Sequence, residues 1–128
     1  MRKLLLLDAD VVIDLHALGL FGKIRKTYDI SLTRNVFQEA KYYKRGRTKI
    51  VIGIKDVNII ENVDIESLRK VQREAKEERL GIDPGETTSI AHLIETTEEI
   101  TFCTCDRAAM KLISYMELEK KSISGTCQ

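Results

Sequence analysis

Short apolar runs along the chain predict β-strands that are buried on both faces. Leu4–Leu7 is a continuous apolar run between Lys3 and Asp8, and Ile100–Cys103 is a similar run much later in the chain. Such runs, bounded by polar residues, are typical of strands in a parallel sheet that is covered on both sides. We expect further strands within Asp29–Leu32, Ile50–Ile54, Val57–Ile60 and Ser122–Cys127.

Apolar residues recur at helical spacing between these runs. Gly19 or Gly22 is expected to end the first helix. Thr33 is a suitable N-cap for the second helix, and Gly46 is expected to end that helix. Strands that alternate with helices predict an α/β fold with a parallel sheet. The expected helices contain Val11, Leu15 and Leu18; Val36, Phe37, Ala40 and Tyr43; Ile65–Leu80; the residues after Asp83-Pro84; and Asp106–Leu118.

Composition adds that the chain forms one folded domain, spanning residues 1–128. Hydrophobic residues make up 43% and charged residues 32%, a balance that argues against disorder. Lys and Arg total 21 and Asp and Glu total 20, so the net charge is +1. Any nucleic-acid site must therefore be a local basic patch.

The sequence favours a cytoplasmic protein without a membrane segment. Asp8, Asp10 and Asp14 interrupt the apolar start before it reaches the length of a secretion signal, and nothing approaches a transmembrane span. The three cysteines, an odd number, are expected to be reduced thiols.

Acidic residues stand where a parallel sheet binds its ligands, beyond the carboxyl ends of the strands. Asp8 directly follows the first strand, and Asp106 follows the strand at Ile100–Cys103 after two residues. Glu86 heads the apolar stripe of its helix, and Glu39 lies on the flank of another apolar helix face.

Each of these acids also has a purely structural interpretation. Asp8 and Asp106 are favoured helix N-caps, and Asp83-Pro84-Gly85-Glu86 reads as a capping box. Glu39 suits a solvated boundary position. Asp10 could reach the same pocket as Asp8 or cap the first helix.

A shared cleft would give the acids a chemical purpose. If Asp8, Glu39, Glu86 and Asp106 converge, their charges need compensation, because like charges raise one another's pKa values. Mg²⁺ or Mn²⁺ prefers such oxygen ligands and also recruits phosphate oxygens. An all-carboxylate site is therefore suited to metal-assisted hydrolysis of phosphodiester bonds.

Four segments in this order make the chain resemble the PIN-domain ribonucleases, especially their VapC-like toxin branch. The match runs from about Lys3 to Thr126. Its segments are Leu5-Leu6-Leu7-Asp8-Ala9-Asp10-Val11-Val12-Ile13, Val36-Phe37-Gln38-Glu39-Ala40, Gly85-Glu86-Thr87-Thr88-Ser89-Ile90-Ala91 and Phe102-Cys103-Thr104-Cys105-Asp106.

The resemblance implies a three-layer α/β/α fold with a mostly parallel sheet and the activity of a Mg²⁺- or Mn²⁺-dependent endoribonuclease. It implies catalytic roles for Asp8, Glu39, Glu86 and Asp106, with Asp8, Glu86 and Asp106 as metal ligands. Thr104 and Asp10 would support these ligands. The resemblance further implies a homodimer and a cognate antitoxin protein as partners.

A basic strip between residues 41 and 49 is the candidate contact for RNA. It contains two tyrosines and no acid, so it could hold the RNA backbone beside a pocket that repels it. A solvated helix end is the alternative interpretation. The cations of the strip are Lys41, Lys44, Arg45, Arg47 and Lys49.

Two other functions remain open on the sequence. Asp8-x-Asp10 after an apolar strand resembles the opening motif of haloacid-dehalogenase-like phosphatases, in which the first Asp is phosphorylated, although no Gly-Asp-x-x-x-Asp motif follows. The same fold could instead be a catalytically inactive module that binds RNA or protein.

Overall fold

A computed structural model describes residues 2–118 as six helices and six strands. The strands are β1 (Leu4–Leu7), β2 (Asp29–Thr33), β3 (Tyr42–Arg45), β4 (Thr48–Val51), β5 (Asn58–Ile60) and β6 (Ile100–Cys103). The helices are α1 (Ala9–Ala17), α2 (Phe21–Thr27), α3 (Arg34–Lys41), α4 (Ile65–Glu77), α5 (Pro84–Glu95) and α6 (Arg107–Tyr115).

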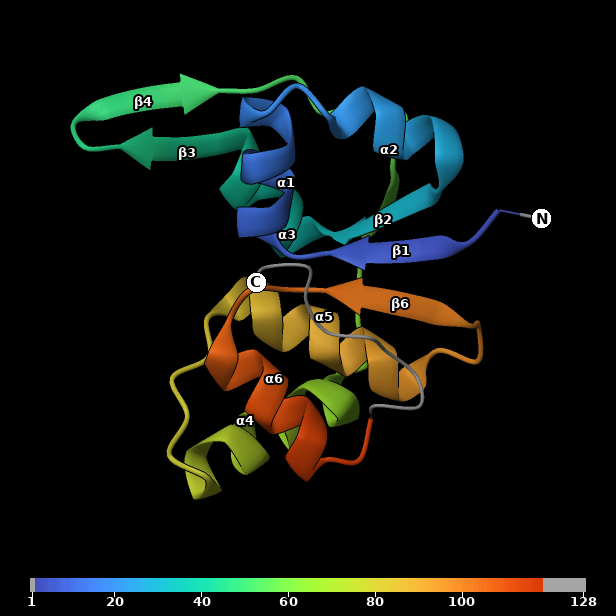
Figure 1. Ribbon diagram of the computed structural model, residues 1–128. Helices are drawn as coiled ribbons and strands as arrows, with labels where there is room; N and C mark the ends of the chain where they lie inside the picture. Colours follow the sequence, from blue (N-terminus) through green and yellow to red (C-terminus); the bar gives the residue numbers. More distant parts are fainter. Residues whose placement is uncertain (1, 119–128) are drawn as a thin grey trace.

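Four of the strands form a parallel sheet in the order β5-β2-β1-β6. β1 is a central strand, with Leu5 opposite Ile30 of β2 and Thr101 of β6. The carboxyl ends of β1 and β6 therefore lie side by side. β3 and β4 pair separately as an antiparallel hairpin, which projects from the body on the side of these carboxyl ends (Figure 1).

Helices cover both faces of the parallel sheet, which gives the molecule three layers (Figure 1). Side chains along β1 alternate between the faces, as the strand repeat requires. Leu6 packs with the apolar residues of α4, α5 and α6, whereas Leu7 packs with those of α1, α2 and α3. Both leucines are at most 1% exposed, so β1 is buried as its apolar run predicts.

The structure confirms the predicted α/β fold and most of its elements. Strands form within the runs at residues 4–7, 29–32, 57–60 and 100–103, and Thr33 caps α3 by accepting a hydrogen bond from the Val36 amide at 3.3 Å. The candidate strand Ser122–Cys127 lies outside the described residues. Among residues 2–118, no helix is long and apolar enough to cross a membrane.

The first helix ends just before Gly19, one of its two predicted terminators, which has a φ of +70°. Gly22, the alternative, lies inside α2, a short helix that was not expected. One prediction about this half of the chain was wrong. The helix behind Thr33 ends at Lys41, well before Gly46, which instead occupies the turn between β3 and β4 with φ of +63°. Tyr43 and Ile50 are opposite each other in this hairpin, so tertiary pairing overrides the helical spacing of Tyr43.

Candidate functional site at the carboxyl edge of the sheet

Asp8 is a buried carboxylate held between two hydrogen-bond donors. Its Oδ1 accepts from the Ala9 amide at 2.9 Å, which caps α1, and its Oδ2 accepts from the Thr104 hydroxyl at 3.0 Å. Asp8 is 3% exposed and Thr104 is fully buried. Burial outweighs these hydrogen bonds, and together with the charges of Asp83 and Asp10 it raises the pKa of Asp8 to about 6.

Thr104 connects Asp8 to the next acid, Asp106. The Thr104 hydroxyl oxygen accepts from the Asp106 amide at 3.1 Å while its proton goes to Asp8. Asp106 is half-buried and caps α6, because its Oδ1 accepts from the Ala109 amide at 3.0 Å. The predicted supporting contact of Thr104 is therefore present, and both proposed N-caps form as well. Capping and a shared site are compatible here.

Glu86 is the acid whose surroundings are least favourable to a negative charge. It lies in the first turn of α5 and is only 4% exposed. Its Oε2 is buried and has no hydrogen-bond partner among the described residues. Burial, a hydrogen bond to the Asp83 carboxyl and the nearby charges of Asp8, Asp83 and Asp106 raise the pKa of Glu86 to about 10.

Three exposed acids lie near these buried carboxyls. Glu39 comes from α3, Asp10 from the first turn of α1, and Asp83 is the N-cap of α5. Partial desolvation and the charges of Asp83, Asp8 and Asp10 raise the pKa of Glu39 to about 7, although water screens a side chain this exposed. Desolvation and neighbouring acids raise the pKa of Asp10 as well.

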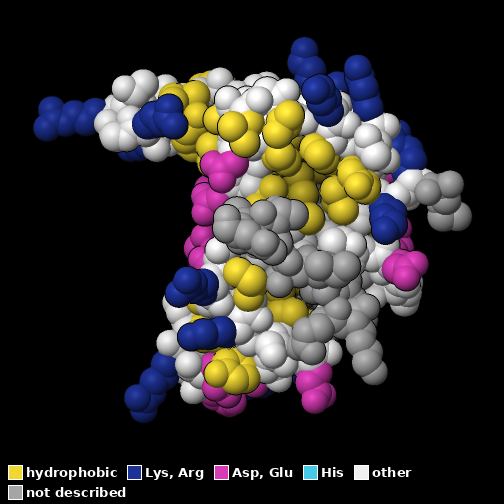
Figure 2. Space-filling view, viewed as in Figure 1, with side chains coloured by type: hydrophobic (Ala, Val, Ile, Leu, Met, Phe, Trp, Pro, Cys, Tyr) yellow, Lys and Arg dark blue, Asp and Glu magenta, His cyan; other side chains and the backbone are white. Residues whose placement is uncertain are grey.

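The structure thus brings all four predicted acids together at one end of the sheet. Figure 2 shows acidic side chains gathered there, below the β3–β4 hairpin. Within residues 2–118, none of the four forms an ion pair with Lys, Arg or His. Their mutual repulsion is left uncompensated by the described part of the protein.

The donor set fits a hard divalent cation, although it is not preassembled around one point. All candidate ligands are carboxylate oxygens, and the buried Glu86 Oε2 lacks any other partner. Within the described residues, however, no three His, Cys, Asp or Glu side chains are already grouped to hold an ion. Repulsion between carboxylates favours this spread in the absence of a cation.

Asp83 is a site residue that the sequence prediction missed. It was interpreted only as the start of a capping box, and its Oδ1 does accept from the Glu86 amide at 2.8 Å. Its charge also acts on Asp8, Asp10, Glu39 and Glu86. The usable signal was its position three residues before Glu86, which places both carboxyls in one turn.

The predicted basic strip is the β3–β4 hairpin together with the end of α3. Lys44 lies directly opposite Lys49, and Arg45 lies opposite Thr48. Lys44, Arg45, Arg47 and Lys49 are exposed, whereas Lys41 is half-buried near the rings of Phe37 and Tyr42. Tyr42 and Val51, 46% and 62% exposed, face each other across the two strands.

The thiols differ from the expectation of three reduced cysteines. Cys103 is a free, buried cysteine at the end of β6, but Cys105 is disulfide-bonded. The prediction of a reduced thiol is therefore wrong for Cys105.

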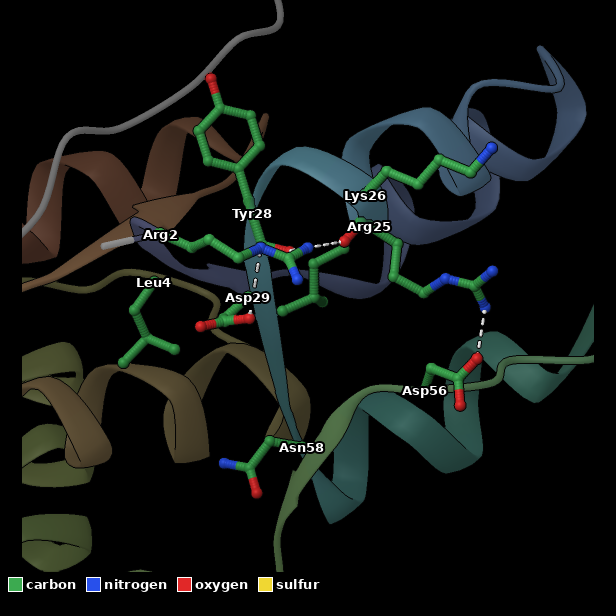
Figure 3. Close-up of a pocket in the computed structure, with 9 residues that line it drawn as sticks. Arg2, Leu4, Arg25, Lys26, Tyr28, Asp29, Asp56 and Asn58 are labelled. Carbon is green, nitrogen blue, oxygen red and sulfur yellow. Dashed lines mark hydrogen bonds and ion pairs between the residues drawn. The ribbon is translucent and has the colours of Figure 1, made fainter.

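A cavity at the opposite edge of the sheet has a different electrostatic character. It measures about 580 Å³ and lies at the amino ends of β1 and β2 (Figure 3). Arg2 pairs with Asp29 at 3.6 Å and also donates to the carbonyls of Arg25 and Tyr28. Arg25 pairs with Asp56 at 3.2 Å. Each carboxylate that lines this cavity thus has an arginine partner.

Comparison of the chain with protein-family models, with curated proteins and with solved structures finds no match.

Proposed function

We propose that the protein is a divalent-metal-dependent endoribonuclease that hydrolyses RNA phosphodiester bonds. The observation that carries the proposal is the buried Glu86 carboxyl, which has an unpartnered oxygen and lies among Asp8, Asp83 and Asp106. A cluster of acids with no internal cation is costly to the fold unless something outside the chain neutralises it. The resemblance to PIN-domain ribonucleases supports the same function.

The buried and the exposed acids of the cluster would have different roles. Asp8, Glu86 and Asp106 would hold Mg²⁺ or Mn²⁺, with Thr104 fixing the orientation of Asp8. Bound there, the ion would polarise the scissile phosphate and lower the pKa of the attacking water. Glu39 and Asp10, which are exposed, can orient water and substrate.

RNA contact is assigned to the β3–β4 hairpin. Figure 2 shows Lys and Arg side chains at the projecting end of the hairpin, above the acidic edge. Phosphates held there would lie near the acidic site without having to approach it through its own repulsive field. The exposed Tyr42 ring can stack on an unpaired base.

Replacing Lys44 and Lys49 together by Ala tests this contact. Affinity for a single-stranded RNA oligonucleotide should fall, and the slope of log affinity against log salt should decrease by about 1.4, because two phosphate contacts are lost. The measurement uses an Asp8→Asn background to prevent cleavage. Lys70→Ala with Arg73→Ala on α4 removes the same charge elsewhere, and an equal loss in that variant would refute a specific role for the hairpin.

The nuclease activity itself is tested by cleavage of a mixed RNA pool with Mg²⁺ or Mn²⁺ present. Asp8→Asn and Asp106→Asn should each lower the rate by about 100-fold or more, because each removes a charged ligand but keeps a cap acceptor. Asp29→Asn at the opposite edge is the matched control. Wild-type rates in both site variants would rule out the proposal.

The phosphatase alternative has weaker support. The opening Asp8-x-Asp10 is not followed by the Gly-Asp-x-x-x-Asp motif that this class of phosphatase would need. Metal-independent RNA binding without cleavage would instead identify an inactive binding module. The toxin role, the cognate antitoxin and the homodimer stay predictions from the resemblance, and co-purification with a neighbouring gene product tests them.

A further inference from the structure

Asp83 carries a negative charge that its structural role does not need. It caps α5 through the 2.8 Å hydrogen bond from the Glu86 amide to its Oδ1. Asn or Ser performs this capping about as well as Asp. Asp83 nevertheless contributes to the unfavourable charge environment of Asp8, Asp10, Glu39 and Glu86, and it is the only described residue that acts on all four. The capping role therefore does not account for placing a negative charge beside four other acids.

Two features of the structure place Asp83 against the other acids. Its carboxyl lies near that of Glu86 and raises the pKa of Glu86, whose Oε2 is buried and has no hydrogen-bond partner among the described residues. Glu39 approaches from the other side, across Gly85. A Cβ at Gly85 would lie 3.5 Å from the Asp83 Oδ1 and 3.8 Å from the Glu39 Oε1. Carboxyls from α3 and from the start of α5 thus converge beside a residue that has no side chain.

Gly85 keeps this approach open. The same Cβ would lie 3.3 Å from the Cγ2 of Val36, tighter than an ordinary contact. A side chain at this position would require Val36 of α3 to shift by a few tenths of an ångström. The glycine therefore leaves room for the Asp83 and Glu39 carboxyls to lie beside it.

We propose that Asp83 is an additional cation ligand of the acidic site, bridging the buried Glu86 and the exposed Glu39. The inference rests on the proposed metal-dependent function and extends its ligand set. It gives one residue two tasks, in which Oδ1 starts α5 and the negative charge attracts the cation. Holding the ligand at a helix N-cap also fixes its backbone, so that little side-chain freedom is lost on binding.

Direct titration of the metal-free full chain with MnCl₂, followed by calorimetry at pH 7.5 without RNA, tests the proposal. Asp83→Asn keeps the cap acceptor and removes the charge, so Mn²⁺ affinity should fall by about 10-fold to 100-fold. Asp83→Ser, a second cap-competent variant, should lose the same affinity while melting near the wild-type temperature.

Asp64→Asn is the matched control, because Asp64 caps α4 in the same way through the Ser67 amide. The Asp64 backbone amide donates to Glu95 at the far end of α5, which is remote from the acidic site. Wild-type Mn²⁺ affinity in both Asp83 variants, with loss in Asp8→Asn, would overturn the role of Asp83 and leave the proposed function standing. If Mn²⁺ binding depends on Asp83 but RNA stays uncut, Asp83 would keep its role as a cation ligand and the proposed nuclease function would be refuted.

Discussion

The two edges of the parallel sheet carry acids in opposite electrostatic settings. At the amino edge, Asp29 and Asp56 pair with Arg2 and Arg25 around an exposed cavity. At the carboxyl edge, Asp8 and Glu86 are nearly fully buried, and no described cation pairs with them. Acidic residues are therefore paired with arginine at one edge and left without a cationic partner among the described residues at the other.

This difference indicates which part of the fold lowers the stability of the protein. An internal salt bridge satisfies its acids permanently and offers little to a ligand. Acids without internal partners destabilise the metal-free protein, but they keep their binding capacity for a cation from solution. We therefore interpret the amino edge as structural and the carboxyl edge as functional.

The largest effect that sharpens this contrast is expected from Thr104→Val. Valine has a similar shape but cannot donate to Asp8 or accept from the Asp106 amide, so the two acids lose their common support. We expect RNA cleavage and Mn²⁺ affinity to fall about 10-fold to 100-fold, as measured by initial rates and calorimetry. Thr104→Ser keeps the hydroxyl and should recover most of both. An inactive Ser variant would instead point to packing.

The second-largest expected difference between the two edges is in the pH dependence of stability. Unfolded carboxyls are ionised by pH 5, but folded Asp8 and Glu39 keep protons up to about pH 6 and 7, and Glu86 up to about pH 10. The folded state therefore binds more protons than the unfolded state between pH 5 and 8. Stability of the metal-free protein must then fall as pH rises, by about 1.4 kcal/mol per pH unit for each proton that only the folded state retains.

Urea unfolding in EDTA at a series of pH values measures this loss. Glu86→Gln should flatten the dependence, because the amide stays neutral in both states. Glu77→Gln on the exposed part of α4 should leave the dependence unchanged. If the slope of unfolding free energy against pH is identical in wild type and Glu86→Gln, the pKa of Glu86 is not raised in the folded state.

The smallest effect is expected at the amino edge. Asp56 has a positive φ of 57°, a conformation that Asn also tolerates, so Asp56→Asn isolates the charge of the ion pair. Because the Asp56 side chain is 81% exposed, stability should change by less than about 1 kcal/mol in thermal melts. Mn²⁺ affinity should not change. A large loss of Mn²⁺ binding would break the distinction between the two edges.

The sequence predicted the central strands well because buried strands leave a local signal. The Leu4–Leu7 and Ile100–Cys103 runs became β1 and β6 with the expected boundaries. The β3–β4 hairpin was missed because Tyr43 fits a helical face, and only its pairing with Ile50 decides otherwise. Spacing of single residues cannot reveal such a partner in advance.

The sequence predicted the site acids that follow strands, but its prediction of the exposed acids was incomplete. Asp8 and Asp106 follow apolar runs, so the rule for parallel sheets located them. Glu39 could be listed as a candidate, but its approach to Asp83 depends on the packing of α3 across Gly85. Asp83 was hidden because a capping motif explained it fully. A motif with one sufficient function does not exclude a second.

The hydrogen bond between Asp8 and Thr104 joins positions 96 residues apart, each directly after one of two neighbouring strands. A nascent chain emerging from the ribosome therefore carries Asp8 almost from the start but cannot position it until β6 has been synthesised and inserted. Under the proposed function, a growing polypeptide would be harmless to the messenger that encodes it, and its destructive capacity would arise only late in translation.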